Sequence, residues 1–181
     1  MSKEFSAGSL DVKRFAEEGA TLAGEEALER FPRLMAETQQ AGADSRVEWS
    51  AKGDLRNPGH VQPEIWLHLK AQAHLVLTFQ RCLGPVEVPV GVDRPFRFVS
   101  DEDAAAAQDE QSDEDVLALS RNFDLPGLIE DEMLMALPLA PMHETCPVPV
   151  KLAVADEDFE DAAPERENPF AILGRFKPGK S

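Results

Sequence analysis

The stretch EIWLHLKAQAHLVLTFQ, residues 64–80, decides the fold because it carries the most regular pattern in the sequence. All eight odd-numbered positions from 65 to 79 are apolar, whereas the even-numbered positions are mostly polar. An alternation of period two is typical of a β-strand with one buried and one solvated face. At about 3.3 Å per residue such a strand would extend roughly 50 Å, so we expect it to bend or curl within a strongly twisted, partly barrel-like sheet.

Shorter alternating segments lie on either side of this stretch. Residues 46–55 alternate around Trp49, and residues 86–98 place Val and Phe at even-numbered positions. Pro89 cannot donate a hydrogen bond to a neighbouring strand, which favours an edge position for the later segment. Three consecutive strands with short connections predict a curled antiparallel meander over residues 45–99.

The segments outside the strands indicate helices. Residues 1–44 have the pattern of an interrupted helical region, in which Leu28, Phe31 and Met35 form an apolar stripe expected to face the core. Pro32 divides this region, because proline in a helix interior removes a hydrogen bond and clashes with the preceding turn. We therefore expect two short helices rather than one long one.

The later part of the chain alternates between acidic and apolar segments. Residues 100–115 hold eight acidic residues and no basic ones, which predicts a disordered acidic loop. Apolar residues at helical spacing from Asp124 to Leu137 predict a helix that Pro138 ends. A second acidic run, residues 156–167, precedes a basic and apolar tip.

These patterns predict the α+β class, with a curled antiparallel sheet packed against a few helices. We expect a single domain over residues 1–155, because 181 residues favour one core over two. Its last part, residues 116–155, comprises the predicted helix and a Pro-rich segment. Residues 156–181 would form an acidic tether that carries the tip.

The charge distribution limits the classes of partner. The formal net charge is −16, and residues 100–181 hold 20 acidic against 6 basic residues, whereas residues 1–99 hold 14 against 12. Binding to nucleic acid gains affinity when Lys and Arg neutralise phosphates, so this balance argues against DNA and against broad contact with naked RNA. It favours a basic protein partner.

Cysteine usage and hydropathy indicate the compartment. Two Cys are too few for a disulfide scaffold, and the first residues lack the pattern of a secretion signal. The densest apolar stretches are interrupted by charge or Pro, so none is expected to span a bilayer. We expect a cytoplasmic protein that does not contact membranes.

The segment IEDEMLMALPLAPMHETC, residues 129–146, concentrates the side chains with possible chemistry. Its acidic triplet (Glu130, Asp131 and Glu132) suits the first turns of a helix, where the dipole favours negative charge. The triplet is a poor two-metal site, because adjacent helical positions point in different directions. We therefore predict no catalytic residue here.

Zinc is the alternative to a recognition surface. Cys82, His143 and Cys146 are possible ligands, since thiolate and neutral imidazole suit zinc, but a closed structural site needs a fourth. Residue 79, where a Cys-x-x-Cys pair would place its first thiol, is Phe79. We predict no metal or other cofactor.

Three segments together resemble the YceD family, the large ribosomal RNA subunit accumulation proteins of bacteria and plastids. They are QRCLGPVEVPV (residues 80–90), IEDEMLMALPLAPMHETC (residues 129–146) and NPFAILGRFK (residues 168–177). Members of this family often carry a Cys-x-x-Cys pair before the turn, which this chain lacks. The resemblance implies support for synthesis, processing or stability of large-subunit ribosomal RNA, without supplying a mechanism.

Our leading hypothesis is a non-catalytic ribosome-biogenesis factor that reaches ribosomal RNA indirectly, through a basic ribosomal or RNA-processing protein. Two alternatives are a metal-dependent RNA-processing enzyme and an acidic escort that shields a basic ribosomal protein. For partner recognition we predict a rigid surface around the Pro-rich segment and the turn before it, with contributions from the acidic triplet and the C-terminal tip. The predicted recognition residues are Arg81, Cys82, Glu130, Asp131, Glu132, Pro138, Pro141, His143 and Phe170.

Overall fold

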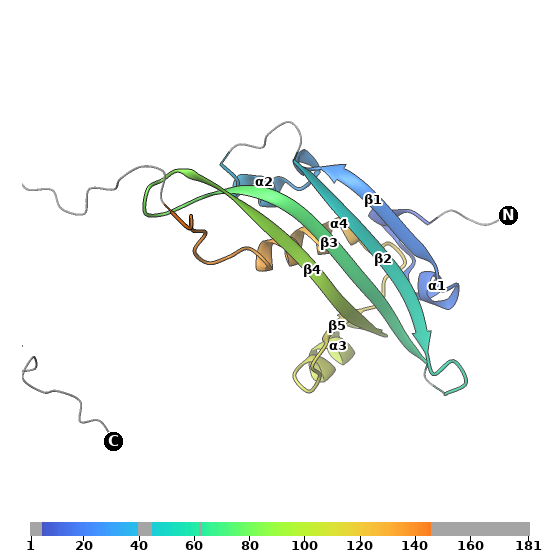
Figure 1. The fold of residues 1–181 in the computed structure, drawn as a ribbon. Coiled ribbons are helices and arrows are strands. Elements are labelled where there is room, and N and C mark those ends of the chain that lie inside the picture. Colours follow the sequence, from blue (N-terminus) through green and yellow to red (C-terminus); the bar gives the residue numbers. More distant parts are fainter. Residues whose placement is uncertain (1–4, 40–44, 62, 146–181) are drawn as a thin grey trace, which may run out of the picture. The chain divides into compact units, whose positions relative to one another are not determined.

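A computed structural model describes residues 5–39, 45–61 and 63–145 of the chain (Figure 1). Its centre is a five-stranded sheet in which the order of the strands follows their order in the sequence. The strands are β1 (Thr21–Ala27), β2 (Arg46–Arg56), β3 (Glu64–Thr78), β4 (Pro85–Val99) and β5 (Asp115–Ala118). The sheet is curled and open, which confirms the α+β class.

The long alternating stretch forms β3, as predicted. In β3 the odd-numbered residues from Ile65 to Leu77 are buried, whereas His68, Lys70, Gln72 and His74 on the other face are exposed. β3 pairs antiparallel with β2 on one side and with β4 on the other. The predicted antiparallel meander over residues 45–99 is therefore confirmed.

The sheet is larger and more mixed than the meander predicted from the sequence. β1 pairs antiparallel with β2, so the prediction that residues 1–44 are helical is wrong for residues 21–27. β5 pairs parallel with residues 96–99 of β4, so the sheet is not wholly antiparallel. The segment of β4 around Pro89 has β3 as its only neighbouring strand in the described chain, and this edge position tolerates a residue that lacks an amide hydrogen.

Short helices cover the face of the sheet formed by the odd-numbered residues of β3. They are α1 (Val12–Glu17), α2 (Pro32–Ala36) and α4 (Leu125–Met135), with single 3₁₀ turns η1 (Ala7–Ser9) and η2 (Leu28–Arg30). Each of these helices buries apolar side chains in the core that it forms with β2, β3 and β4, including Phe15, Leu34 and Ile129. Pro32 starts α2 at its first turn, where proline is tolerated, so two short helical pieces replace one long helix as predicted. Met35 is exposed, however, and only Leu28 and Phe31 of the predicted stripe are buried.

Residues 100–115 are ordered, contrary to the prediction of a disordered acidic loop. They contain helix α3 (Glu102–Asp109), whose first turn is capped by Asp101, because the Asp101 Oδ1 accepts a hydrogen bond of 2.9 Å from the Ala104 amide. Arg97 of β4 holds the segment, since its guanidinium donates to Glu114, Gln108 and Ser112 at 2.8–3.0 Å. One partly buried arginine thus neutralises and fastens an acidic segment that has little apolar surface of its own.

The description above concerns the unit formed by residues 1–148. The predicted acidic tether and tip, residues 156–181, lie outside the described residues. Within the described ranges, no helix combines the length and the hydropathy needed to cross a membrane.

Candidate functional site

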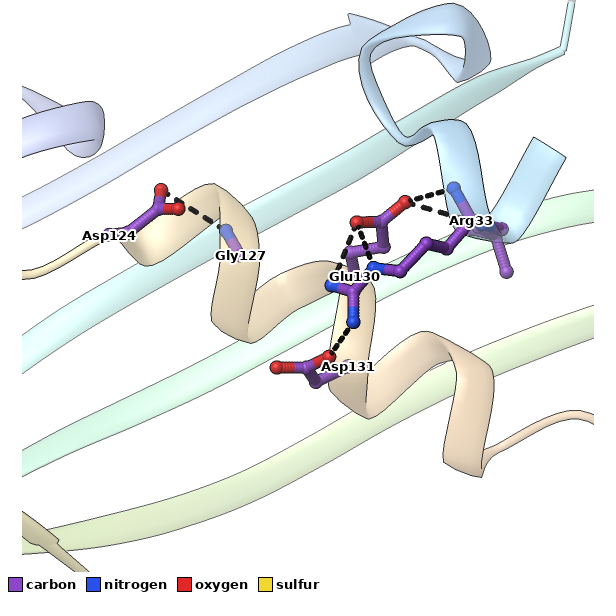
Figure 2. A network of polar contacts seen from close by, with 6 residues as sticks. Arg33, Asp124, Gly127, Glu130 and Asp131 are labelled. Carbon is purple, nitrogen blue, oxygen red and sulfur yellow. Dashed lines mark hydrogen bonds and ion pairs between the residues drawn. The ribbon is translucent and has the colours of Figure 1, made fainter. Parts of the chain in front are cut away.

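The acidic triplet lies in the middle of α4 and not in its first turns, where the sequence analysis placed it. The first turn is capped by Asp124, whose carboxylate accepts a hydrogen bond of 3.2 Å from the Gly127 amide (Figure 2). Glu130 points toward α2 instead. Its Oε1 accepts hydrogen bonds from the amides of Arg33 and Leu34, at 2.7 and 3.2 Å. Since Phe31 has no capping side chain, Glu130 caps helix α2 from a different part of the chain.

Arg33 extends this contact into an ion-pair network. Its guanidinium binds Oε2 of Glu130 at 2.8–2.9 Å and Oδ1 of Asp131 at 2.6 Å (Figure 2). The two carboxylates raise the pKa of Arg33, chiefly through the hydrogen bonds from its side chain. Glu130 is buried, whereas Asp131 and Arg33 are about half exposed.

Glu132 points to a different arginine. Its Oε2 accepts a hydrogen bond of 3.0 Å from Arg94 of β4, and Arg94 also binds Asp115 of β5. Burial raises the pKa of Glu132, and Arg94 opposes that rise. Glu130 and Asp131 therefore converge on Arg33, whereas Glu132 turns to Arg94, so the predicted divergence of the three carboxylates holds only for Glu132. Their predicted part in recognition stays a prediction, with Asp131 the most accessible of the three.

Cys82 and His143, far apart in sequence, meet at the turn between β3 and β4. Two backbone hydrogen bonds close this turn, from the Phe79 amide to the Gly84 carbonyl at 2.9 Å and from the Leu83 amide to the Phe79 carbonyl at 2.8 Å. A Cβ placed on Gly84 would lie 3.3 Å from Cys82 Sγ and 3.8 Å from His143 Nε2, so both side chains approach the same point. The structure thus joins the turn to the segment that leaves α4.

Within the described part of the chain, His143 is held by packing and not by hydrogen bonds. Its ring packs edge-on against Phe79, with centroids 5.4 Å apart. The Nε2 atom is buried without a hydrogen-bond partner, which is uncommon for a polar atom.

Two of the candidate zinc ligands are therefore close together, and Phe79 packs against the imidazole. Cys146, the third, lies outside the described residues. Within residues 5–39, 45–61 and 63–145, no group of three or more His, Cys, Asp or Glu side chains is arranged to hold a metal. Two donors fall short of the four ligands of a structural zinc site, so these residues do not make one by themselves.

The other predicted recognition residues divide between surface and core. Arg81 and Pro138 are exposed, whereas Pro141 is buried and fixes the segment against the domain. Phe170 lies outside the described residues.

Sequence reasoning missed the uncovered face of the sheet. A hollow of about 840 Å³ lies there across β1, β2, β3 and β4, lined in part by Ala23, Ser50 and Gly91. Beside these small residues, Asp93 binds Lys70 at 2.9 Å and His68 at 2.6 Å. The hydrogen bond from Lys70, followed by that from His68, lowers the pKa of Asp93. The signal in the sequence was the row of small side chains at polar-face positions of neighbouring strands.

Comparison with known proteins gives matches over most of the strands and the α4 region. A family model described as "Large ribosomal RNA subunit accumulation protein YceD" matches residues 67–177. A Haemophilus influenzae protein of the same description is 33% identical over 110 residues, which are 60% of this chain and 63% of the relative. The aligned part thus spans less than two-thirds of that relative. No solved structure gives a significant match.

Proposed function

Because the chain belongs to the YceD family, the large ribosomal RNA subunit accumulation proteins, we propose that it supports the synthesis, processing or stability of large-subunit ribosomal RNA without catalysing a reaction. The observation that carries the non-catalytic part is that all three carboxylates of the acidic triplet are paired with arginines. Glu130 is committed to Arg33 and the start of α2, and Glu132 to Arg94. Carboxylates held in this way stabilise the domain and do not converge on a reacting group.

The protein acts, in this proposal, through a basic ribosomal or RNA-processing protein. The net charge of −16 opposes direct contact with phosphates and favours a cationic surface. The turn at residues 79–84 and the segment at residues 137–145 form the recognition surface. The packing of His143 against Phe79 and its approach to Gly84 tie the two segments of this surface together.

The proposed function is tested by depletion. We expect cells that lack the protein to contain less mature large-subunit ribosomal RNA relative to small-subunit ribosomal RNA, and re-expression to restore the ratio. An unchanged ratio would exclude the proposed function. Binding of purified protein to ribosomal RNA fragments, measured against salt concentration, tests the indirect route. Tight, salt-sensitive binding to RNA alone would exclude that part.

A metal-dependent RNA-processing enzyme is the second candidate, and the approach of Cys82 to His143 is the observation that favours it. It predicts stoichiometric zinc in the purified protein and cleavage of precursor RNA that is lost in His143→Ala. The non-catalytic proposal predicts neither.

A further inference from the structure

Large apolar side chains are exposed at one end of the long strands. Six such residues are exposed within the described parts of the chain, and four of them belong to the β3–β4 turn, to the end of α4 or to the segment that follows α4. The exposed fractions of these four lie between 66% and 104%. We call them the turn–exit patch: Leu83, Met135, Leu139 and Met142.

The residues that flank the turn–exit patch are held by contacts with the rest of the domain. Leu83 stands between Cys82 and Gly84, which both lie beside His143, and Met142 directly precedes His143. The end of α2 also fastens the turn, since the Gln39 side chain donates a hydrogen bond of 3.1 Å to the Leu83 carbonyl. The exposed side chains are therefore held by elements that are themselves tied to the core.

The composition of the patch indicates a protein partner. Exposed apolar residues that cluster on a soluble surface mark interaction sites, whereas single ones are ordinary. Methionine is flexible and polarisable, so that it adapts to the apolar side chains of another protein. RNA offers no aliphatic side chains to bury against such a surface.

The charge around the patch narrows the choice of partner. Of the five acidic residues within residues 124–145, Glu130 and Glu132 are buried against arginines and Asp131 is paired with Arg33, whereas Glu144, two positions after Met142, is exposed. Arg81 in the turn is exposed as well, so the attraction of a basic partner comes from the net charge of the chain. A second copy of this chain also carries a charge of −16, and an anionic membrane or RNA is negative as well, so long-range repulsion opposes all three. A basic segment is attracted.

We propose that the turn–exit patch docks an amphipathic, basic segment of a partner protein. The apolar face of the segment covers Leu83, Leu139 and Met142, while its Lys and Arg side chains are attracted by the net negative charge of the chain, with the exposed Glu144 next to the patch. This mode resembles an amphipathic helix laid on an apolar surface. The inference rests on the proposed function, because it names the chemistry of the partner through which that function is exerted.

The test uses the full-length protein and synthetic helical peptides, with affinity measured by fluorescence anisotropy. One peptide places Leu at i, i+3, i+4 and i+7 and Lys or Arg elsewhere, and a second has the same composition in scrambled order. We expect the amphipathic peptide to bind at least about tenfold more tightly than the scrambled one. We expect the double variant Leu139→Ser, Met142→Ser to weaken its binding by at least about tenfold, since two apolar contacts are lost.

Val61 supplies the matched control. It is 96% exposed and precedes β3, whereas Leu83 follows the end of that 15-residue strand, so the two residues lie near opposite ends of it. Val61→Ser should leave peptide binding unchanged. Circular dichroism of each variant establishes that the fold is retained, and Leu83→Ser provides a second variant on the other segment of the patch.

Three results would overturn the proposal. They are equal binding of the two peptides, unchanged binding by the double variant, and a dimer of the wild-type chain that the double variant abolishes. The ribosomal RNA ratio in cells that carry the double variant separates this inference from the proposed function. Lost peptide binding with a normal ratio would mean that the docking does not serve the proposed function, which depletion tests separately, whereas intact peptide binding by the double variant would contradict the docking whatever the ratio.

Discussion

Glu130 and Arg33 are joined at three points although 97 positions separate them in the chain. The Glu130 carboxylate accepts a hydrogen bond from the Arg33 amide at 2.7 Å, and the Arg33 side chain returns to the same carboxylate through Nε and a terminal nitrogen at 2.9 and 2.8 Å. Glu130, a buried residue of α4, thus caps helix α2 and also forms an ion pair with Arg33 of that helix.

Removal of this cap should destabilise the domain. We expect Glu130→Ala to lower the free energy of unfolding by about 2–3 kcal/mol, because α2 loses a capping group and a charge-assisted pair, while Arg33 can turn to solvent. Asp131→Ala is the matched control, and we expect it to cost less than about 1 kcal/mol, as is usual for an exposed pair. Urea denaturation measures both, and equal losses would contradict a capping role.

The pH dependence of stability should reveal the burial of Glu132. Its pKa is raised in the folded state, so its contribution to stability is fully present below the pKa of the unfolded chain and is lost as pH rises through the folded pKa. We expect the stability of Glu132→Gln relative to wild type to improve as pH rises from about 4 to 7, the range above a model carboxyl pKa. Denaturation at several pH values measures the difference. A relative stability that falls over this range would mean that the pair with Arg94 outweighs burial.

Gly53 of β2 lies directly beneath the backbone of helix α1. A Cβ at this position would lie 2.6 Å from the Phe15 carbonyl oxygen and 2.8 Å from the Ala16 Cα, both in α1. We expect Gly53→Ala to destabilise the protein by about 1–3 kcal/mol through overpacking, because the atoms it meets are backbone and cannot turn aside. Gly8→Ala is the control, since nothing lies within 4 Å of its Cβ, and thermal unfolding compares the two.

His143→Phe tests the meaning of the unpartnered imidazole. If no metal is bound, the substitution keeps a ring against Phe79 and removes a buried nitrogen without a hydrogen bond, so we expect stability to be unchanged or to rise by up to about 1 kcal/mol. Thermal unfolding measures the effect, and elemental analysis of both proteins measures zinc. Stoichiometric zinc in the wild type that disappears in the variant, together with a loss of stability, would establish a metal site.

The strands could be predicted because their signal is repeated within each one. β3 and β4 are each fifteen residues long, and their buried positions alternate over most of that length. β1 has the same alternation in the structure, but its seven residues, TLAGEEA, hold few apolar side chains and two adjacent acidic ones. Its place in the sheet depends on the pairing with β2, which a local pattern does not contain.

The candidate site was only partly predictable for a related reason. Helical spacing predicted that the acidic triplet diverges, yet Glu130 and Asp131 both bind Arg33 and only Glu132 turns to another arginine. The partners of those side chains are distant in the sequence. Carboxylates of α4 are neutralised by arginines that lie earlier in the chain, namely Arg33 and Arg94. Composition alone predicted disorder for residues 100–115, because it does not show that Arg97 binds this segment.

The sequential order of the strands also bears on how the chain folds during synthesis. Each strand from β2 onward pairs with the one made just before it, antiparallel up to β4 and parallel at β5, so the sheet can assemble in order as the chain emerges. The bridge between Leu10 and Phe123 and the contact of Glu130 with Arg33 must wait until α4 has been made. Until then the apolar face of β3 has no α4 to cover it, and the nascent chain is most prone to aggregation in that interval.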